Sequence, residues 1–132
     1  MSLRHFAFTK LVVSDLESAA TFYTSVFGLT ERKRVSSEIG PRAIDEIMYD
    51  PTAPGAGSFI LLRYRDTAGP SNDEVIVGFV VDDVDDTMVR AVGAGAAVTR
   101  EASDMPEHGM RVGFVTDPEG HLIEIVERLP TG

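Results

Sequence analysis

The sequence predicts an α+β fold in which two βαβββ modules form a curved eight-stranded mixed sheet, with an open concave cleft and the helices on the outer face. Two internal repeats support this prediction. The segment VVSDLE at 12–17 recurs as VVDDVD at 80–85, and GSFILL at 57–62 recurs as GHLIEI at 120–125. Such repeats indicate that two similar units share one architecture. Each unit is small, so we expect the two to share a core.

The first module begins with an apolar strand that ends at Val13. Asp15 then offers a helix N-cap, and apolar side chains recur every 3.6 residues over the predicted helix at 16–28. Gly28 is a suitable end for that helix because glycine readily adopts a left-handed conformation. The remaining residues of the module have room for three strands, which we place at about 30–36, 43–49 and 57–62.

The second module repeats this order. Four acids, Asp82, Asp83, Asp85 and Asp86, gather where its helix should start, and the helix ends at Gly93 or Gly95. Strands are predicted at about 97–102 and 110–116. A turn at 117–120 then leads into the closing strand, because Pro118 fixes φ and Gly120 can take a positive φ.

The predicted organisation is a single domain, 1–132, made of modules at about 4–66 and 74–129 joined by a linker at about 67–73. The linker contains glycine, proline and asparagine, which favour loops. No cysteine occurs among the 132 residues, which excludes disulfides and thiolate metal sites and is typical of a cytoplasmic protein. The longest strongly apolar run, 75–81, is too short to cross a membrane.

The net charge of −9 is unevenly distributed. Residues 1–66 contain 8 basic and 8 acidic side chains, whereas residues 67–132 contain 4 basic and 13 acidic ones. An acidic surface repels phosphate groups and so argues against a nucleic-acid partner. Part of the charge is explained by the acids at the start of the second helix.

Glu124 is the most conspicuous polar residue, because it lies in the middle of the apolar closing strand LIEIV. An unpaired buried carboxylate is costly, so this position needs an explanation. One interpretation is that Glu124 faces solvent or pairs with Arg63 or Arg111. The other is that it points into the cleft and contacts a metal or a substrate.

The chain resembles the vicinal oxygen chelate superfamily, which includes glyoxalase I, bleomycin-resistance and fosfomycin-resistance proteins and extradiol dioxygenases. The resemblance rests on VVSDLESAATFYTSVFGL at 12–29 and FVTDPEGHLIEIVE at 114–127. It implies a divalent metal on the concave face, with ligands from the first and last strands of each half. Carried over by position, those ligands fall on Phe8, Leu61, Ile76 and Glu124. Only Glu124 can coordinate a metal.

Because this chain departs from the family at three of the four ligand positions, no metal cofactor is expected, although zinc, nickel, manganese or iron could bind if a histidine helped. His5 and His121 are each three residues from a ligand position, so they face the opposite side of a regular strand. His108 lies in a loop and has no evident partner. We expect His121 to support the turn.

Two functional hypotheses remain open, besides a third in which the protein is a dimeric partner or regulatory subunit that binds no ligand. In the first, the protein binds a small organic molecule, as bleomycin-resistance proteins do, in a cleft with apolar Phe8, Leu61 and Ile76. The polar candidates for orienting that molecule are Tyr49, Glu46, Arg63 and Arg111. In the second, the protein is a lactoylglutathione-lyase-like, other glyoxalase-type or dioxygenase-like enzyme, and Glu124 is its general base. The resemblance also implies a homodimer, and no membrane partner is expected.

Overall fold

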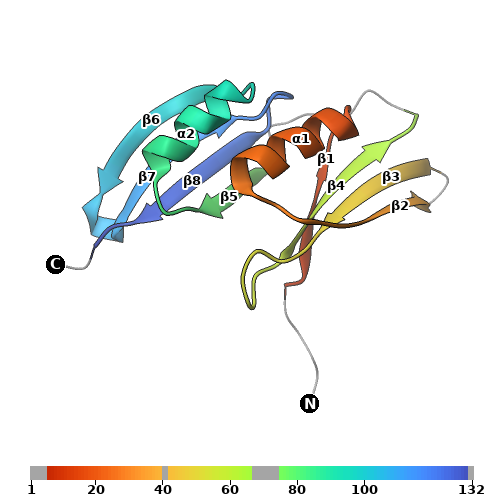
Figure 1. The fold of residues 1–132 in the computed structure, drawn as a ribbon, viewed down its shortest axis with the longest axis horizontal. Helices are drawn as coiled ribbons and strands as arrows, with labels where there is room; N and C mark the ends of the chain where they lie inside the picture. The colour runs from red at the N-terminus through yellow and green to blue at the C-terminus, as the bar shows by residue number, and fades with distance from the viewer. Residues whose placement is uncertain (1–5, 40–41, 67–74, 131–132) are drawn as a thin grey trace, which may run out of the picture. The chain divides into compact units, whose positions relative to one another are not determined.

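The computed structural model describes residues 6–39, 42–66 and 75–130. Within them, eight strands, two α-helices and a short 3-10 helix occur in the order β1–α1–β2–β3–β4–β5–α2–β6–η1–β7–β8 (Figure 1). They divide into two compact units: the first contains β1 to β4 and most of α1, and the second contains β5 to β8. The predicted linker at 67–73 and His5 lie outside the described residues.

The first unit is a four-stranded mixed sheet with the order β1-β4-β3-β2. β1 and β4 pair in parallel, and the other neighbours are antiparallel. Its elements are β1 (Phe8–Val12), α1 (Leu16–Phe27), β2 (Glu31–Ile39), β3 (Arg42–Tyr49) and β4 (Ser58–Tyr64).

The second unit repeats this topology with the order β5-β8-β7-β6, and β5 and β8 are its parallel pair. The prediction of two βαβββ modules is therefore confirmed, with the eight strands in two four-stranded sheets. The elements are β5 (Ile76–Val80), α2 (Val84–Gly93), β6 (Ala97–Met105), η1 (Pro106–His108), β7 (Met110–Thr116) and β8 (Leu122–Arg128).

The edge strands β2 and β6 extend further than the sequence indicates. Both were predicted to end three residues earlier, at 36 and 102, because polar residues follow those positions. In the structure, Ser37 pairs with Ile44, and Ser103 pairs with Val112. An edge strand tolerates such residues because one of its sides faces no other strand.

Each helix starts as its sequence predicts. The Asp15 carboxylate accepts a hydrogen bond from the Ser18 N–H, and the Asp83 carboxylate accepts one from the Asp86 N–H, both at 3.0 Å. These bonds satisfy N–H groups that have no partner inside the helix. α1 is followed by Gly28 in the left-handed conformation, with φ of 67°, as expected from the sequence.

The turn before β8 is held by the buried side chain of Asp117. Its Oδ1 accepts hydrogen bonds from the N–H groups of Glu119 and His121, both at 2.9 Å, and the His121 ring lies against the same carboxylate. Gly120 has a φ of 93°, which glycine adopts without strain. His121 therefore supports the turn, as predicted. No helix among the described residues is long and apolar enough to span a membrane.

Gly113 in β7 provides a test of how closely α2 packs on its sheet. A Cβ at this position would lie 2.3 Å from Met88 Sδ and 3.4 Å from Val84 Cγ1, whereas a Cβ at Gly93 would meet nothing within 4 Å. We expect Gly113→Ala to lower the free energy of unfolding by about 1–3 kcal/mol through overpacking. Gly93→Ala, its control, should raise it by about 0.5–1 kcal/mol. Urea titration measures both; equal stability of the two variants would contradict this packing.

Candidate functional site

The two faces of the first sheet have different neighbours. The Tyr23 ring of α1 packs on the Phe59 ring of β4, with centroids 5.0 Å apart. Side chains alternate along a strand, so Phe59 and Leu61 share this helix face. Ile60 and Leu62 point the other way. We call the side of each sheet turned away from its own helix the far face.

The far face of the first unit carries an ion pair. Lys10 of β1 lies beside Ile60, and its Nζ is 2.8 Å from Glu46 Oε2. The Glu46 side chain is only 5% exposed, whereas that of Lys10 is 32% exposed. The ammonium is also 5.7 Å from the centre of the Phe8 ring. Glu46 is thus a polar group on the far face, as the sequence suggested, and its cationic partner is Lys10.

Sequence reasoning missed Lys10, because a single lysine in a strand usually reaches solvent. A signal was available: Lys10 is two residues from Phe8, so both share one face of β1. Strand pairing then brings that face next to the face of β3 that contains Glu46.

Glu124 lies on the far face of the second unit. A Cβ on Gly113 would strike Met88 and Val84 of α2, so Gly113 and its partner Ile125 belong to the helix face. Glu124 therefore points away from α2, between Gly78 on β5 and Phe114 on β7. It is half-buried, and its side chain forms no hydrogen bond or ion pair with another described residue. Gly78 has no side chain, which leaves space beside the carboxylate.

Phe8 and Ile76 also lie on far faces, as the hypothesis of an apolar cleft requires. Phe8 is 50% exposed and Ile76 is 58% exposed. Each occupies the first position of its parallel strand pair, Phe8 opposite Ser58 and Ile76 opposite Leu122.

Leu61 and Tyr49, by contrast, lie on the helix face and not on the far face with Phe8. Both are fully buried, and the Tyr49 ring is 6.2 Å from that of Phe59. Burial raises the pKa of Tyr49. The first-module counterpart of Glu124 is therefore Ile60 and not Leu61. Ile60 lies opposite Lys10 on β1, just as Glu124 lies opposite Gly78 on β5. A shift of one residue reverses the face of a strand.

The two arginines also belong to the helix faces. Arg63 Nη1 is 3.7 Å from Asp45 Oδ2, and Arg111 Nη2 is 3.0 Å from Asp85 Oδ1 on α2. Arg111 Nη1 also contacts Asp104 at 3.0 Å, and its hydrogen bonds to Asp85 lower the pKa of that carboxyl. Neither arginine pairs with Glu124, so this sequence-based alternative is wrong.

The donor set on the far faces does not fit the metal that the resemblance implies. Corrected by the register, the four ligand positions are Phe8, Ile60, Ile76 and Glu124, and only the last provides a donor atom. Metal sites in proteins usually use three or more protein ligands. No group of three His, Asp or Glu side chains able to hold a metal occurs among the residues that the structure describes. His121 is engaged with Asp117, and His108 is exposed on η1.

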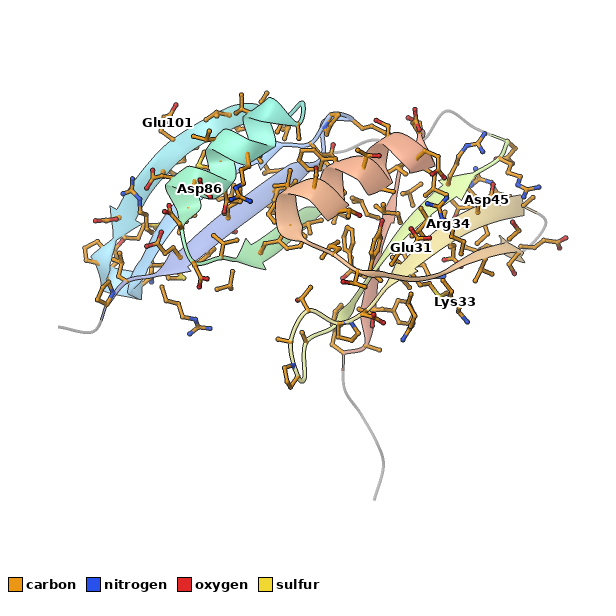
Figure 2. All side chains as sticks on the ribbon, viewed as in Figure 1. Glu31, Lys33, Arg34, Asp45, Asp86 and Glu101 are labelled. Carbon is orange, nitrogen blue, oxygen red and sulfur yellow. The ribbon has the colours of Figure 1, made fainter. Side chains whose placement is uncertain are left out.

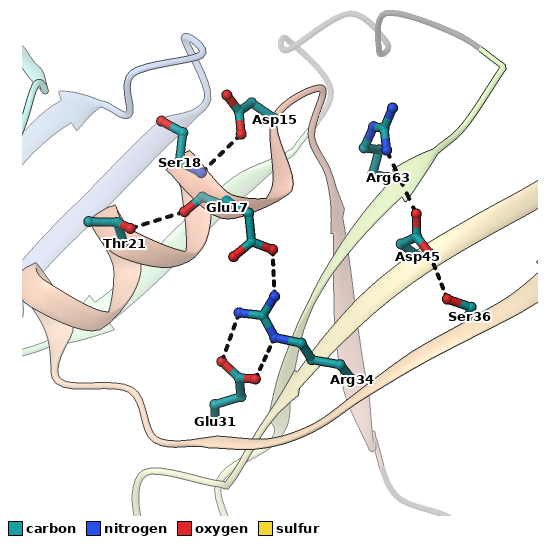
Figure 3. A network of polar contacts seen from close by, with 9 residues as sticks. All are labelled: Asp15, Glu17, Ser18, Thr21, Glu31, Arg34, Ser36, Asp45 and Arg63. Carbon is teal, nitrogen blue, oxygen red and sulfur yellow. Dashed lines mark hydrogen bonds and ion pairs between the residues drawn. The ribbon is translucent and has the colours of Figure 1, made fainter.

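A charged groove of about 560 Å³ lies on the helix side of the first unit, beside the start of α1. The Arg34 guanidinium bridges Glu17 of α1 and Glu31 of β2 (Figure 3). Asp45 accepts hydrogen bonds from Arg65 and from Ser36, at 2.7 Å each. These charges largely satisfy one another, and Arg63 lies on this side because alternation along β4 places it on the same face as Phe59 and Leu61.

The chain belongs to the Glyoxalase/Bleomycin resistance protein/Dioxygenase superfamily, whose family model matches residues 2–125. A probable lactoylglutathione lyase of Vibrio parahaemolyticus is 28% identical over 122 residues, which cover 90% of this chain and 87% of that protein. The lactoylglutathione lyase of Salmonella typhimurium is also 28% identical, covering 94% of this chain and 93% of the relative.

Solved structures have the same fold. A glyoxalase family protein from Bacillus cereus superposes with a TM-score of 0.84 over 98% of this chain and 97% of that chain, at 22% identity. A glyoxalase-related enzyme from Fulvimarina pelagi has a TM-score of 0.67 and 27% identity, over 96% of this chain and 89% of that chain. These structures place the repeated modules within a known fold.

The Asp45 cluster makes stability depend on acid. Hydrogen bonds from Arg65 and Ser36 lower the pKa of Asp45 from 3.8 to about 2. The contribution of the Asp45 carboxylate to stability is fully present above the pKa that this carboxyl has in the unfolded chain. It is lost as the pH falls through the lower pKa of the folded protein. We expect the stability advantage of the wild type over Asp45→Asn to be constant from pH 7 to 5 and to shrink towards pH 2.

Urea titrations between pH 7 and 2.5 measure this advantage. Asp50→Asn is the control, since Asp50 is an exposed carboxylate at the end of β3. A difference between wild type and Asp45→Asn that is the same at every pH would contradict the assigned hydrogen bonds.

Proposed function

We propose that the protein binds a small organic molecule on the far faces of its sheets, without the metal common in its superfamily. The observation that carries this proposal is the donor set: three of the four ligand positions are Phe8, Ile60 and Ile76. Carbon side chains cannot coordinate a metal, but they provide the apolar surface of a small-molecule site. Each far face has a polar group of the kind that such a site needs: Glu124 in the second unit, and the Lys10–Glu46 pair in the first.

Ile60 is buried, at 5% exposed, so support comes from the exposure of Ile76 and of Val80 on the same strand. Ile76 and Val80 of β5 are 58% and 63% exposed, and both lie on the far face of the second unit. Covering them with a ligand would remove apolar surface from water, which contributes about 25 cal/mol per Å². Glu124 is half-buried on β8, beside β5, and its carboxylate would then select a ligand with a cationic or hydrogen-bond-donating group.

Ligand-induced stabilisation tests this proposal. We expect compounds from a broad library to raise the melting temperature, since a ligand that binds only the native state stabilises it. Ile76→Asn should remove the shift by placing an amide in the apolar contact. Val75→Asn is the matched control, because Val75 is 42% exposed and precedes β5, where alternation turns it away from the face that carries Ile76. The proposal is contradicted if no compound stabilises the wild type, or if both variants respond equally.

A second candidate is a glyoxalase-type lyase or isomerase, and two observations favour it. The similar proteins from Vibrio and Salmonella are named lactoylglutathione lyases. Glu124 is a carboxylate without a partner among the described residues, so it is free to accept a proton. In an α-hydroxycarbonyl substrate it would remove the proton from the hydroxyl-bearing carbon, and the electron pair would move onto the carbonyl oxygen to give an enediolate. Return of that proton to the former carbonyl carbon, with transfer of the hydroxyl proton to the former carbonyl oxygen, would leave the carbonyl on the carbon that was deprotonated.

The enzyme hypothesis predicts the behaviour of Glu124→Gln. Glutamine keeps the shape of the side chain but cannot take the proton, so any lactoylglutathione lyase activity should fall by about 10²–10⁴-fold while the melting temperature stays the same. Glu107→Gln, at an exposed position on η1, is the control. Unchanged activity in Glu124→Gln would eliminate this residue as the base.

We also propose that the chain is a single domain, from its length and internal repeats, and that it is cytoplasmic, from its lack of cysteine. A homodimer is proposed because the resemblance implies it. These three proposals are compatible with either function, because both need only the far faces described above.

A further inference from the structure

A groove of about 310 Å³ lies between α2 and β6, on the helix side of the second unit. Its lining is Asp85, Met88, Val89, Val92, Val98 and Glu101. It is therefore separate from Glu124, which points to the opposite side of the same sheet. The far-face proposal makes no use of this groove.

The groove exposes more apolar surface than the packing of α2 explains. Val84 and Met88 are buried against the sheet, but Val89 is 72% exposed and Val92 is 49% exposed. On β6, Val98 is 40% exposed. These valines come from two elements and line one depression, so they form a continuous apolar surface rather than scattered single residues.

The polar rim of the groove is negative. Arg111 lies between Asp85 and Asp104, so the three side chains together keep one negative charge. Glu101 of β6, labelled in Figure 2, has no hydrogen bond or ion pair with another described residue. Nearby Asp86 is balanced by Arg90 at 3.0 Å. The chain's whole net charge of −9 lies in residues 67–132, which adds a field of the same sign.

We propose that this groove binds a lipophilic organic cation, whose apolar groups cover Val89, Val92 and Val98 while its charge lies near Glu101. The valines provide the affinity for apolar surface, and the acidic rim sets the sign of the charge. An anion of the same size would meet the same valines but would be repelled by the rim.

Tetraphenylphosphonium and tetraphenylborate test the proposal, because they are similar in size and apolar surface and opposite in charge. Isothermal titration in a sodium buffer should show binding of the cation and at least about tenfold weaker binding of the anion. Val89→Asn should weaken binding of the cation by about tenfold, since it removes one valine side chain that the bound cation would cover. Glu101→Gln should weaken it less, and added salt should reduce that difference.

Ile76→Asn is the matched control, since it changes an exposed apolar residue on the far face of the same unit. Binding of the cation that survives Ile76→Asn and is lost in Val89→Asn supports the groove, whatever the outcome of the far-face experiment. Three results would overturn the proposal: equal binding of both ions, loss of binding in Ile76→Asn only, or self-association of the free protein that Val89→Asn abolishes. The last result, seen by light scattering, would mean that a second copy covers the valines.

Discussion

The parallel pairing of the first and last strands in each module determines which side chains lie on each face of the sheets. Phe8 lies opposite Ser58 and Ile76 lies opposite Leu122, and every later side chain on those strands follows by alternation. This register directs Glu124 to the far face of its sheet and Leu61 to the helix face. It also places Lys10 and Gly78 at equivalent positions, so that one module carries an ammonium where the other leaves a space.

The fold could be predicted from the sequence because its signals are local and repeated. The N-cap aspartates, Gly28 and the turn at 117–120 each determine their own surroundings, and all of them behave as predicted. The facing of side chains was harder to predict. Alignment of Gly57 with Gly120 implies that equivalent residues of the two modules are 63 positions apart, whereas strand pairing shows that they are 64 apart. Because of this difference of one position, the sequence pointed to Leu61 as the counterpart of Glu124, and the structure gives Ile60.

The arginines were misplaced for a different physical reason. Arg63 and Arg111 lie on strands that also contribute to the far faces, and sequence alone does not reveal their partners. In the structure each turns towards acids on its helix side, Asp45 for the first and Asp85 for the second. The far face of the first unit keeps the ion pair Lys10–Glu46 and also Arg42, which lies on the same side of β3 as Glu46 and pairs with Asp66. The far face of the second unit presents the exposed apolar residues Ile76 and Val80, which suit contact with an organic molecule better than coordination of a metal.

We propose that this member of the superfamily works without the metal, because its ligand positions carry Phe8, Ile60 and Ile76. The most direct test is the metal content of the protein, purified without a metal-binding tag and then dialysed against zinc, nickel, manganese and iron in turn. We expect elemental mass spectrometry to find far less than one equivalent of retained metal, and Glu124→Gln to leave that amount unchanged. Near-stoichiometric metal that is lost in Glu124→Gln would contradict it.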